Sequence, residues 1–235
     1  MRSFALALAG LAALSLGGCV TARHDPSARL DASTTANWTP RDREFLTNAP
    51  HAHTPVPVPY QRHLVDYHRK EAPGTIVVES DDRYLYYVLP EGKALRYGVT
   101  VGEEALAWSG VATIGRMQEW PAWVPTQEIK QRLANIPDYV KPGAHNPLGA
   151  RALYLYQDNK DTLFRIHGTN QPEYIGRAIS SGCIRMTNED AIDLFNRVKI
   201  GTPVVVLPPG RGPRLFSFTA PAAPPASQVM AASAF

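Results

Sequence analysis

The chain has 235 residues, of which 44% are hydrophobic and 19% are charged, an ordinary composition for one globular domain with appendages. Its 21 prolines and 17 glycines favour a turn-rich β fold over a helix bundle. The net charge is +3, and no dense Lys/Arg stripe is interleaved with aromatic residues, so we expect no nucleic-acid partner.

The N-terminus has the pattern of an export signal. Arg2 supplies a positive charge, and residues 4–16 form an apolar run that is too short to span a bilayer. The run leads into L-G-G-C, which is similar to a bacterial lipobox and would make Cys19 the lipidated first residue of the mature protein. We therefore expect a signal peptide over 1–18, a lipid anchor in a membrane, and a location on the periplasmic side of a bacterial cell envelope. Ordinary cleavage after Ala22, giving a soluble periplasmic protein, is the alternative.

The chain contains two cysteines, and a disulfide between them is the simplest state for an exported protein. If Cys19 carries lipid or leaves with the signal, Cys183 remains as a lone thiol. A lone thiol in an oxidising compartment is a candidate reactive group. No C-x-x-C pair exists, so nothing supports a thioredoxin-like redox role.

Residues 19–73 are polar and irregular, and we expect them to form a lipid-anchored tether and lead-in. One short helix is predicted there, with Thr39 as N-cap, Pro40 at the first helical position and Asp42 three residues after the cap. The alternating prolines over 55–59 indicate an extended spacer.

Several histidines in this lead-in could suggest a metal site. No Cys, Asp or Glu stands at ligand spacing, so we interpret them as surface residues and expect no metal. They are His51, His53, His63 and His68.

The folded domain is predicted over 74–207 and is mainly β, because β-branched and aromatic runs are separated by turn residues. The predicted strands are 74–79, 83–89, 94–101, 108–114, 152–156, 162–166 and 203–207. Short helices are predicted over 126–133 and 188–198, the second with Asn188 as N-cap and one apolar face. The Pro- and Gly-rich loop 137–149 is typical of a lid or binding edge. The Pro/Ala-rich tail 208–235 is expected to be disordered.

Residues 165–186 carry the candidate chemistry. His167 stands at the end of a predicted strand, and Cys183 follows sixteen positions later. A thiol with a histidine near it is the minimal set of groups for nucleophilic acyl transfer. A neighbouring imidazole, or a cation such as Arg185, would lower the pKa of the thiol and raise its thiolate fraction.

Glycines flank both candidate residues. Gly182 permits a tight turn before the thiol, where the N–H groups of Gly182 and Cys183 could face a developing oxyanion. The imidazole of His167 needs an acceptor for its other nitrogen, and the carbonyl of Gly168 is the candidate.

At these residues the chain resembles the L,D-transpeptidase catalytic domain of the YkuD type. That family's signature is a histidine followed by Gly or Ser, then about fifteen residues, then S-H-G-C-[IVL]-[RN]. The matching pieces here are His167-Gly168-Thr169 and Ser180-Ser181-Gly182-Cys183-Ile184-Arg185-Met186. The resemblance extends from Gly74 to Val206 and includes the W-S-G at Trp108, the N-P-L-G-A-R-A-L-Y-L over 146–155 and the N-E-D helix.

The resemblance implies a YkuD-type, sandwich- or barrel-like β fold with few short helices, and an acyltransferase without a cofactor. Cys183 would be the nucleophile and His167 the general base, acting on peptidoglycan stem tetrapeptides. The thiol would attack the carbonyl of the third residue, usually diaminopimelate, and expel D-Ala. The acyl group would pass to an amine on another stem or on a lipoprotein lysine, with roles in cell-wall biogenesis and cell shape. Thr169, Ser180 and Ser181 would neighbour the substrate.

Ser181 departs from the family pattern, which more often has histidine there, and serine cannot replace a histidine as a base. The departure concerns substrate preference and rate more than reaction class. Two alternatives stay open. Water as the acceptor would make the protein an L,D-carboxypeptidase. A catalytically silent wall-binding lipoprotein is the third interpretation, and the intact histidine–cysteine pair argues against it.

Three further residues have competing interpretations. Arg185 could serve catalysis or a structural ion pair. His145 is expected to be exposed rather than to contact substrate, and Tyr139 and Trp108 are expected to pack.

Overall fold

The computed structural model describes residues 35–210, except 48, 53, 103–108, 133–134, 181 and 209. The strands are β1 His63–Asp66, β2 Ile76–Glu79, β3 Tyr84–Leu89, β4 Lys93–Gly98, β5 Val101–Gly102, β6 Gly110–Glu119, β7 Arg151–Gln157, β8 Lys160–His167, β9 Ala178–Ser180, β10 Ile184–Arg185 and β11 Pro203–Val206. The helices are α1 Pro40–Thr47, α3 Gln127–Arg132 and α4 Asn188–Arg197, with short 3-10 turns η1 Val58–Tyr60 and η2 Pro172–Tyr174. Cys19, Trp108, Ser181 and nearly all of the tail lie outside the described residues.

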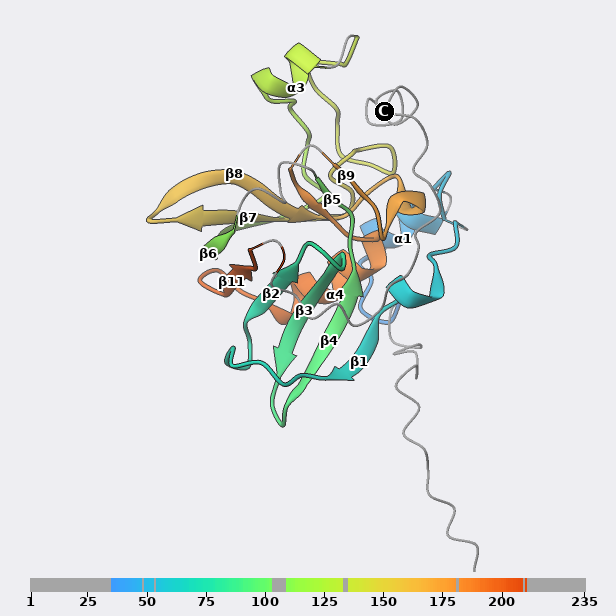
Figure 1. Ribbon diagram of the computed structural model, residues 1–235. Coiled ribbons are helices and arrows are strands. Elements are labelled where there is room, and N and C mark those ends of the chain that lie inside the picture. The colour runs from blue at the N-terminus through green and yellow to red at the C-terminus, as the bar shows by residue number, and fades with distance from the viewer. Residues whose placement is uncertain are drawn as a thin grey trace, which may run out of the picture.

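Within the described residues, nine strands form one mixed sheet in the order β1-β4-β3-β2-β11-β6-β7-β8-β10, and β5 pairs with β9 in a small second sheet (Figure 1). Most neighbours are antiparallel, but β11 runs parallel to β2 and β10 runs parallel to β8. The prediction of a mainly β fold with few short helices is therefore confirmed. β11, the last strand within the described residues, lies in the middle of the sheet.

The large sheet bends around α4. Tyr97 of β4 and Ile166 of β8 lie near opposite ends of the sheet, yet both belong to one core together with Leu194 of α4. A flat sheet could not bring these strands to one helix. The apolar helix face expected from the sequence faces this core, because Ala191, Leu194, Phe195 and Val198 all pack there.

The β7–β8 hairpin turns between the two strands predicted over 152–156 and 162–166. Gln157 pairs with Lys160, so Asp158 and Asn159 form a two-residue turn. Both turn residues have positive φ, 49° and 62°, as a type I′ hairpin requires. The hairpin projects from the sheet in Figure 1, and its second strand ends at His167.

The N-cap of α4 corrects the sequence prediction. Thr187, not Asn188, is the cap, and its hydroxyl accepts a hydrogen bond from the Asp190 N–H at 3.1 Å. Asn188 is the first helical residue, and its side chain binds two backbone groups of other segments instead. Thr187 and Asp190 have the same spacing as Thr39 and Asp42 in α1, so the local sequence carries a signal for Thr187 as the cap, and the long-range bonds of Asn188 agree with it.

The described part of the lead-in is not a tether. The predicted helix is present, and its capping box closes in both directions: Thr39 N donates to Asp42 Oδ2 at 2.9 Å, and Asp42 N donates to Thr39 Oγ1 at 3.1 Å. However, α1 packs on the domain, because its Leu46 shares a core cluster with Trp120 and with Ile192 of α4. Further on, β1 pairs with β4, so the folded unit begins well before residue 74.

Two smaller predictions are also wrong. His63 is buried rather than on the surface, and Tyr139 is 58% exposed rather than packed. His145 is exposed, as predicted. The described residues contain no cluster of three or more His, Cys, Asp or Glu side chains that could hold a metal ion.

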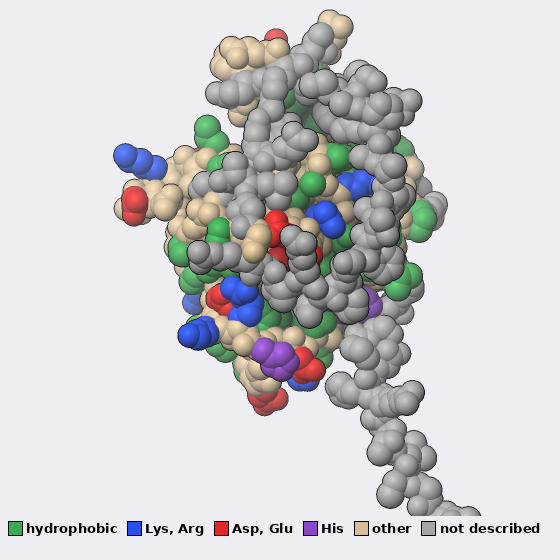
Figure 2. Space-filling model, viewed as in Figure 1, with side chains coloured by type: hydrophobic (Ala, Val, Ile, Leu, Met, Phe, Trp, Pro, Cys, Tyr) green, Lys and Arg blue, Asp and Glu red, His purple; other side chains and the backbone are tan. Residues whose placement is uncertain are grey.

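Charged side chains of both signs are interspersed on the face shown in Figure 2. Within the described part of the chain, no helix is both long enough and apolar enough to cross a bilayer.

Candidate active site

The parallel pairing of β8 and β10 brings the chain segments of the two candidate residues next to each other. Ile184 pairs with Ile166, and both point into the core. Cys183 directly precedes β10, and Arg185, two residues later, pairs with His167. The alternation of side chains along a strand is therefore consistent with Cys183 and His167 facing the side of the sheet away from these two isoleucines. The pairing thus brings the end of β8 and the start of β10 together, although sixteen positions separate His167 and Cys183 in the sequence.

The imidazole of His167 is buried and held in one orientation. Its Nδ1 lies 2.5 Å from the carbonyl oxygen of Gly168, the acceptor that the sequence indicates. A carbonyl only accepts, so Nδ1 carries the proton and Nε2 keeps its lone pair. The ring is therefore in the tautomer that a general base requires.

Asn188 fixes the backbone that carries this carbonyl. Its Oδ1 accepts from the Ala150 N–H at 2.8 Å, and its Nδ2 donates to the Thr169 carbonyl at 2.8 Å. A Cβ added to Gly168 would lie 2.3 Å from Asn188 Oδ1, so glycine is required by this close approach. Asn188 is a positioning residue that the sequence indicates only as a helix cap.

A buried ion pair supports the same region from α1. Asp42 is fully buried and accepts two hydrogen bonds from the Arg151 guanidinium, both at 2.8 Å. The indole N–H of Trp120 donates to Asp42 as well, at 2.8 Å. Arg151 is 2% exposed, and its carbonyl accepts the Gly168 N–H at 2.9 Å. The pair thus holds the strand beside His167.

The electrostatic environment favours neutral forms of both candidate residues. Burial lowers the pKa of His167 to about 3, and the charges of Arg185 and Arg165 act in the same direction. Burial also raises the pKa of the Cys183 thiol above its ordinary value, while Arg165 and Arg185 oppose this rise. Arg185 lowers the pKa of the thiol, as the sequence predicts, but the net pKa is raised because burial outweighs the nearby cations. Both shifts favour the uncharged thiol and the neutral imidazole.

Arg165 is a site residue that sequence reasoning misses. Its backbone hydrogen-bonds the Cys183 thiol, and its charge lowers the pKa of that thiol. Its guanidinium is held by both carboxylate oxygens of Asp161, at 2.6 and 2.8 Å, and lies over the Tyr154 ring. The signal in the sequence is its spacing, because a residue two positions before His167 on the same strand has its side chain on the same face of the sheet.

The other predicted site residues lie around this pair. Arg185 pairs with His167 in the β10–β8 register and donates to Gln171 Oε1 at 3.3 Å. No ion pair of Arg185 is found within the described residues. Ser180 donates to the Cys183 carbonyl at 2.5 Å, which ties the loop ahead of the thiol.

Thr169 and the glycines near the thiol complete the arrangement. Thr169 is buried, and its hydroxyl accepts from the Gln171 N–H at 3.0 Å, so it shapes the loop after His167. Gly182 has a φ of 119°, a conformation that L side chains rarely adopt. A Cβ on Gly102 would lie 2.4 Å from Gly182 N, so the small sheet approaches this loop closely.

A family model described as the L,D-transpeptidase catalytic domain (YkuD) matches residues 73–206, more than half of the chain. The chain belongs to this L,D-transpeptidase family. It is 34% identical over 167 residues to "Probable L,D-transpeptidase ErfK/SrfK" of Escherichia coli K12, covering 67% of this chain and 50% of that protein. It is 30% identical over 165 residues to "Probable L,D-transpeptidase YcfS" of the same strain, with the same coverage. The chain thus spans about half the length of these relatives.

Two solved structures are also similar to this L,D-transpeptidase family member, both with TM-scores below 0.5. An L,D-transpeptidase from Mycobacterium smegmatis is 15% identical, with 57% of this chain and 58% of that chain covered and a TM-score of 0.44. A Brucella melitensis protein described as a probable carnitine operon oxidoreductase is 46% identical, with 63% and 94% covered and a TM-score of 0.43. Family membership rests on the family model and the E. coli relatives.

Proposed function

We propose that this chain is a cysteine-dependent L,D-transpeptidase that acts on peptidoglycan stem tetrapeptides ending in D-Ala. The observation that supports the proposal is the β8–β10 register, which brings the end of β8 at His167 next to the start of β10, directly after Cys183. The hydrogen bond between His167 Nδ1 and the Gly168 carbonyl leaves Nε2 available for a proton. Membership of the L,D-transpeptidase family supplies the reaction class and the substrate class.

In the first step, Cys183 Sγ attacks the carbonyl carbon of the third stem residue while its proton passes to His167 Nε2. The tetrahedral intermediate collapses as the C–N bond to D-Ala breaks, and His167 returns the proton to the departing amine. The products are a thioester on Cys183 and free D-Ala. Because both groups are neutral at rest, His167 acts as a general base during attack and not as the partner of a preformed thiolate.

In the second step, an amine attacks the thioester carbonyl and gives its proton to His167. The C–S bond breaks, and the proton returns from His167 to the sulfur. An amine on a second stem gives a cross-link, and an amine on a lipoprotein lysine gives protein attachment. Water in place of the amine would give a carboxypeptidase, and no contact of the described residues favours water.

The N–H groups of Gly182 and Cys183 are our candidates for stabilising the oxyanion in both steps. The positive φ of Gly182 supports a turn in which consecutive N–H groups face one side. Arg185 and Arg165 add positive charge near the developing anion, since both lower the pKa of the Cys183 thiol. We infer an electrostatic role for Arg185 in preference to a structural ion pair.

We also propose that the enzyme works in the bacterial cell envelope, on the periplasmic side, anchored through lipid on Cys19. The support is the signal-like N-terminal sequence together with the wall substrate of the proposed reaction. Membrane fractionation tests the anchor: Cys19→Ser should move the protein from the membrane fraction to the soluble fraction. An unchanged distribution would exclude anchoring through Cys19.

The reaction is tested by incubating the chain with purified muropeptides and identifying the products by mass. The proposal predicts free D-Ala together with dimers linked between two third-position residues, and neither product with Cys183→Ala. Tripeptide and D-Ala without dimers, even with added amine acceptor, would favour the hydrolase. No product at all would favour the silent wall-binding protein.

A further inference from the structure

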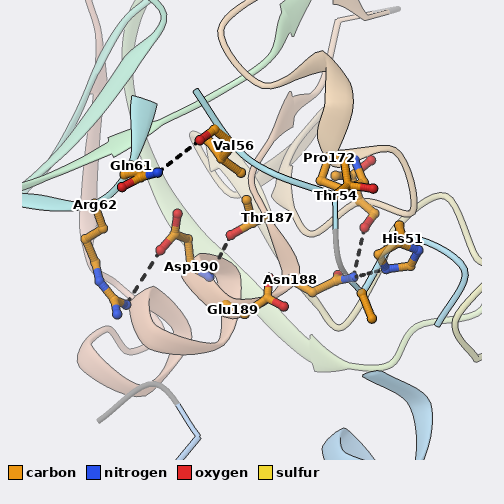
Figure 3. Close-up of a pocket in the computed structure, with 12 residues that line it drawn as sticks. His51, Thr54, Val56, Gln61, Arg62, Pro172, Thr187, Asn188, Glu189 and Asp190 are labelled. Atoms are coloured by element: carbon orange, nitrogen blue, oxygen red, sulfur yellow. Dashed lines mark hydrogen bonds and ion pairs between the residues drawn. The ribbon is translucent and has the colours of Figure 1, made fainter. Parts of the chain in front are cut away.

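The folded lead-in places one histidine beside the candidate active site. His51 lies where the lead-in crosses the start of α4, and its ring faces the side chain of Asn188 (Figure 3). The distance between His51 Nε2 and Asn188 Nδ2 is 3.2 Å. His51 lies outside residues 73–206, which the family model matches. The contact therefore joins the lead-in to the catalytic domain of the family.

Backbone hydrogen bonds after α1 hold His51 in this place. Leu46, near the end of α1, is buried in a core cluster, and its carbonyl accepts from the Ala49 N–H at 3.3 Å. The carbonyl of Ala49, itself buried, accepts from the Ala52 N–H at 2.9 Å. The His51 carbonyl accepts from the Thr54 N–H at 3.0 Å. These bonds connect the position of His51 to the packing of α1.

Two backbone groups fix the orientation of the Asn188 amide. Its Oδ1 accepts from the Ala150 N–H, and its Nδ2 donates to the Thr169 carbonyl, both at 2.8 Å. A flipped amide would set donor against donor and acceptor against acceptor, because a backbone N–H only donates and a carbonyl only accepts. The second N–H of Nδ2 is therefore the group that faces His51.

This orientation determines the state of the His51 ring. Because Asn188 Nδ2 only donates, His51 Nε2 accepts, so the ring is neutral with its proton on Nδ1. Burial lowers the pKa of His51, and the neighbouring His145 lowers it further, which favours this neutral form. The charged residues that line the pocket around His51 are Arg62, Glu189 and Asp190. A proton on Nε2 would replace the acceptor by a donor and break the contact.

Asn188 needs this acceptor because it is buried, with only 3% of the residue exposed. A buried N–H that loses its partner pays the full cost of desolvation. With His51 in place, Oδ1 and both N–H groups of the Asn188 amide have hydrogen-bond partners. His51 thus completes the set of bonds that keeps this side chain in one orientation.

Asn188 in turn borders the carbonyl that orients His167. A Cβ built on Gly168 would lie 2.3 Å from Asn188 Oδ1, and the carbonyl of Thr169, the next residue, accepts from Asn188 Nδ2. A tilt of the Asn188 side chain would therefore move the Gly168 peptide. That peptide carries the oxygen that lies 2.5 Å from His167 Nδ1.

We propose that His51 is a positioning residue for His167. Its Nε2 completes the hydrogen bonds of Asn188, and Asn188 holds the Gly168 carbonyl against the imidazole. The lead-in thereby acts on the candidate active site through one side chain of α4. That His167 is the general base of the reaction rests on the proposed function.

The contact is tested by NMR in Cys183→Ala, so that no turnover interferes. As the pH falls through the pKa of His51, the side-chain amide of Asn188 and the backbone amide of Thr169 should shift with the midpoint of the His51 ring. In His51→Gln these shifts should be absent, because a glutamine amide does not titrate and its oxygen can accept from Asn188. Signals that do not follow the His51 ring, or that move equally in His51→Gln, would overturn the proposal.

Kinetics test the effect on His167. His51→Leu removes the acceptor and should lower kcat for D-Ala release about tenfold, with KM within about twofold of the parent. His51→Gln should recover most of this loss. The acid limb of its kcat profile should lie at lower pH than that of the parent, because residue 51 no longer gains a proton. His68→Leu replaces an exposed histidine of the lead-in and is the matched control.

The outcomes separate this proposal from the proposed function. Failure of the native chain to release D-Ala would refute the proposed function and leave the NMR result standing. Release of D-Ala with kcat unchanged in His51→Leu, or with equal losses in His51→Leu and His51→Gln, would refute the role of His51 alone. If His51→Leu does not fold, the NMR titration of the chain that keeps His51 still decides.

Discussion

Replacing Asp42 by Asn tests whether α1 is an integral part of the folded domain. The substitution keeps the side-chain shape, but it leaves the Arg151 guanidinium, only 2% exposed, without its anionic partner. Breaking a buried ion pair by removing one partner costs about 3–5 kcal/mol of the free energy of unfolding. The hydrogen bond from Trp120 Nε1 also weakens, because its acceptor changes from a carboxylate to an amide.

Urea unfolding followed by tryptophan fluorescence measures this loss. Asp66→Asn is the matched control, because Asp66 pairs with Lys93 on the surface, where its side chain is 63% exposed. An exposed pair contributes about 0–1 kcal/mol, so the control should be nearly neutral. Thr39→Ala breaks the capping box but keeps the ion pair and should cost about 1 kcal/mol. The reasoning fails if Asp42→Asn costs no more than Asp66→Asn.

The pH dependence of stability gives a second measurement of the same pair. Although burial opposes it, hydrogen bonding to Arg151, Thr39 and Trp120 lowers the pKa of Asp42 from 3.8 to about 2. A depressed folded-state pKa stabilises the fold above about pH 3.8, and this stabilisation is lost as the pH falls towards 2. The loss is about 2 kcal/mol, at about 1.4 kcal/mol per pKa unit. Asp42→Asn should remove this part of the acid transition.

Three further outcomes follow from other contacts. Gly168→Ala should reduce kcat/KM for acylation at least tenfold. The added Cβ would lie 2.3 Å from Asn188 Oδ1 and would displace the carbonyl that orients His167. Activity near that of the parent would contradict the orienting role. Alkylation of Cys183 by iodoacetamide should rise with pH through a midpoint above that of an unperturbed cysteine thiol, since burial raises the pKa of the Cys183 thiol. A midpoint below that of a free cysteine measured in parallel would indicate an activated thiolate instead. Burial raises the pKa of Glu79 from 4.5 to about 7, so the folded state binds this proton at a higher pH than the unfolded state does. The free energy of unfolding should therefore fall as the pH rises from 4.5 to about 7, by up to about 3 kcal/mol. Glu79→Gln should flatten that slope in urea unfolding, and an unchanged slope would exclude Glu79 as its cause.

Elements with strong local signals could be predicted from the sequence. The capping box of α1 and the turn of the β7–β8 hairpin need only neighbouring residues, and both are present. The apolar face of α4 follows from helical spacing. By contrast, β10 is two residues long and exists because it pairs with β8, so no local pattern indicates it.

The same distinction between local signals and long-range contacts holds for the candidate site. The motif predicts His167 and Cys183, and the contact of the imidazole with the Gly168 carbonyl follows from the need for an acceptor. The direction of the Cys183 pKa shift could not be predicted, because it depends on how deeply the fold buries the thiol. Asn188 acts through bonds to Ala150 and Thr169, and Asp42 acts through Arg151. Spacing along the sequence does not predict such long-range pairs.

Intact-mass spectrometry of the chain with a carbapenem, a β-lactam substrate mimic for this family, tests the central claim most directly. The account predicts a single acyl adduct that peptide mapping places on Cys183. Cys183→Ala should gain no adduct, while Asp66→Asn should react like the parent. No adduct while Cys183 remains reduced, or an adduct on another residue, would contradict the assignment of Cys183 as the nucleophile.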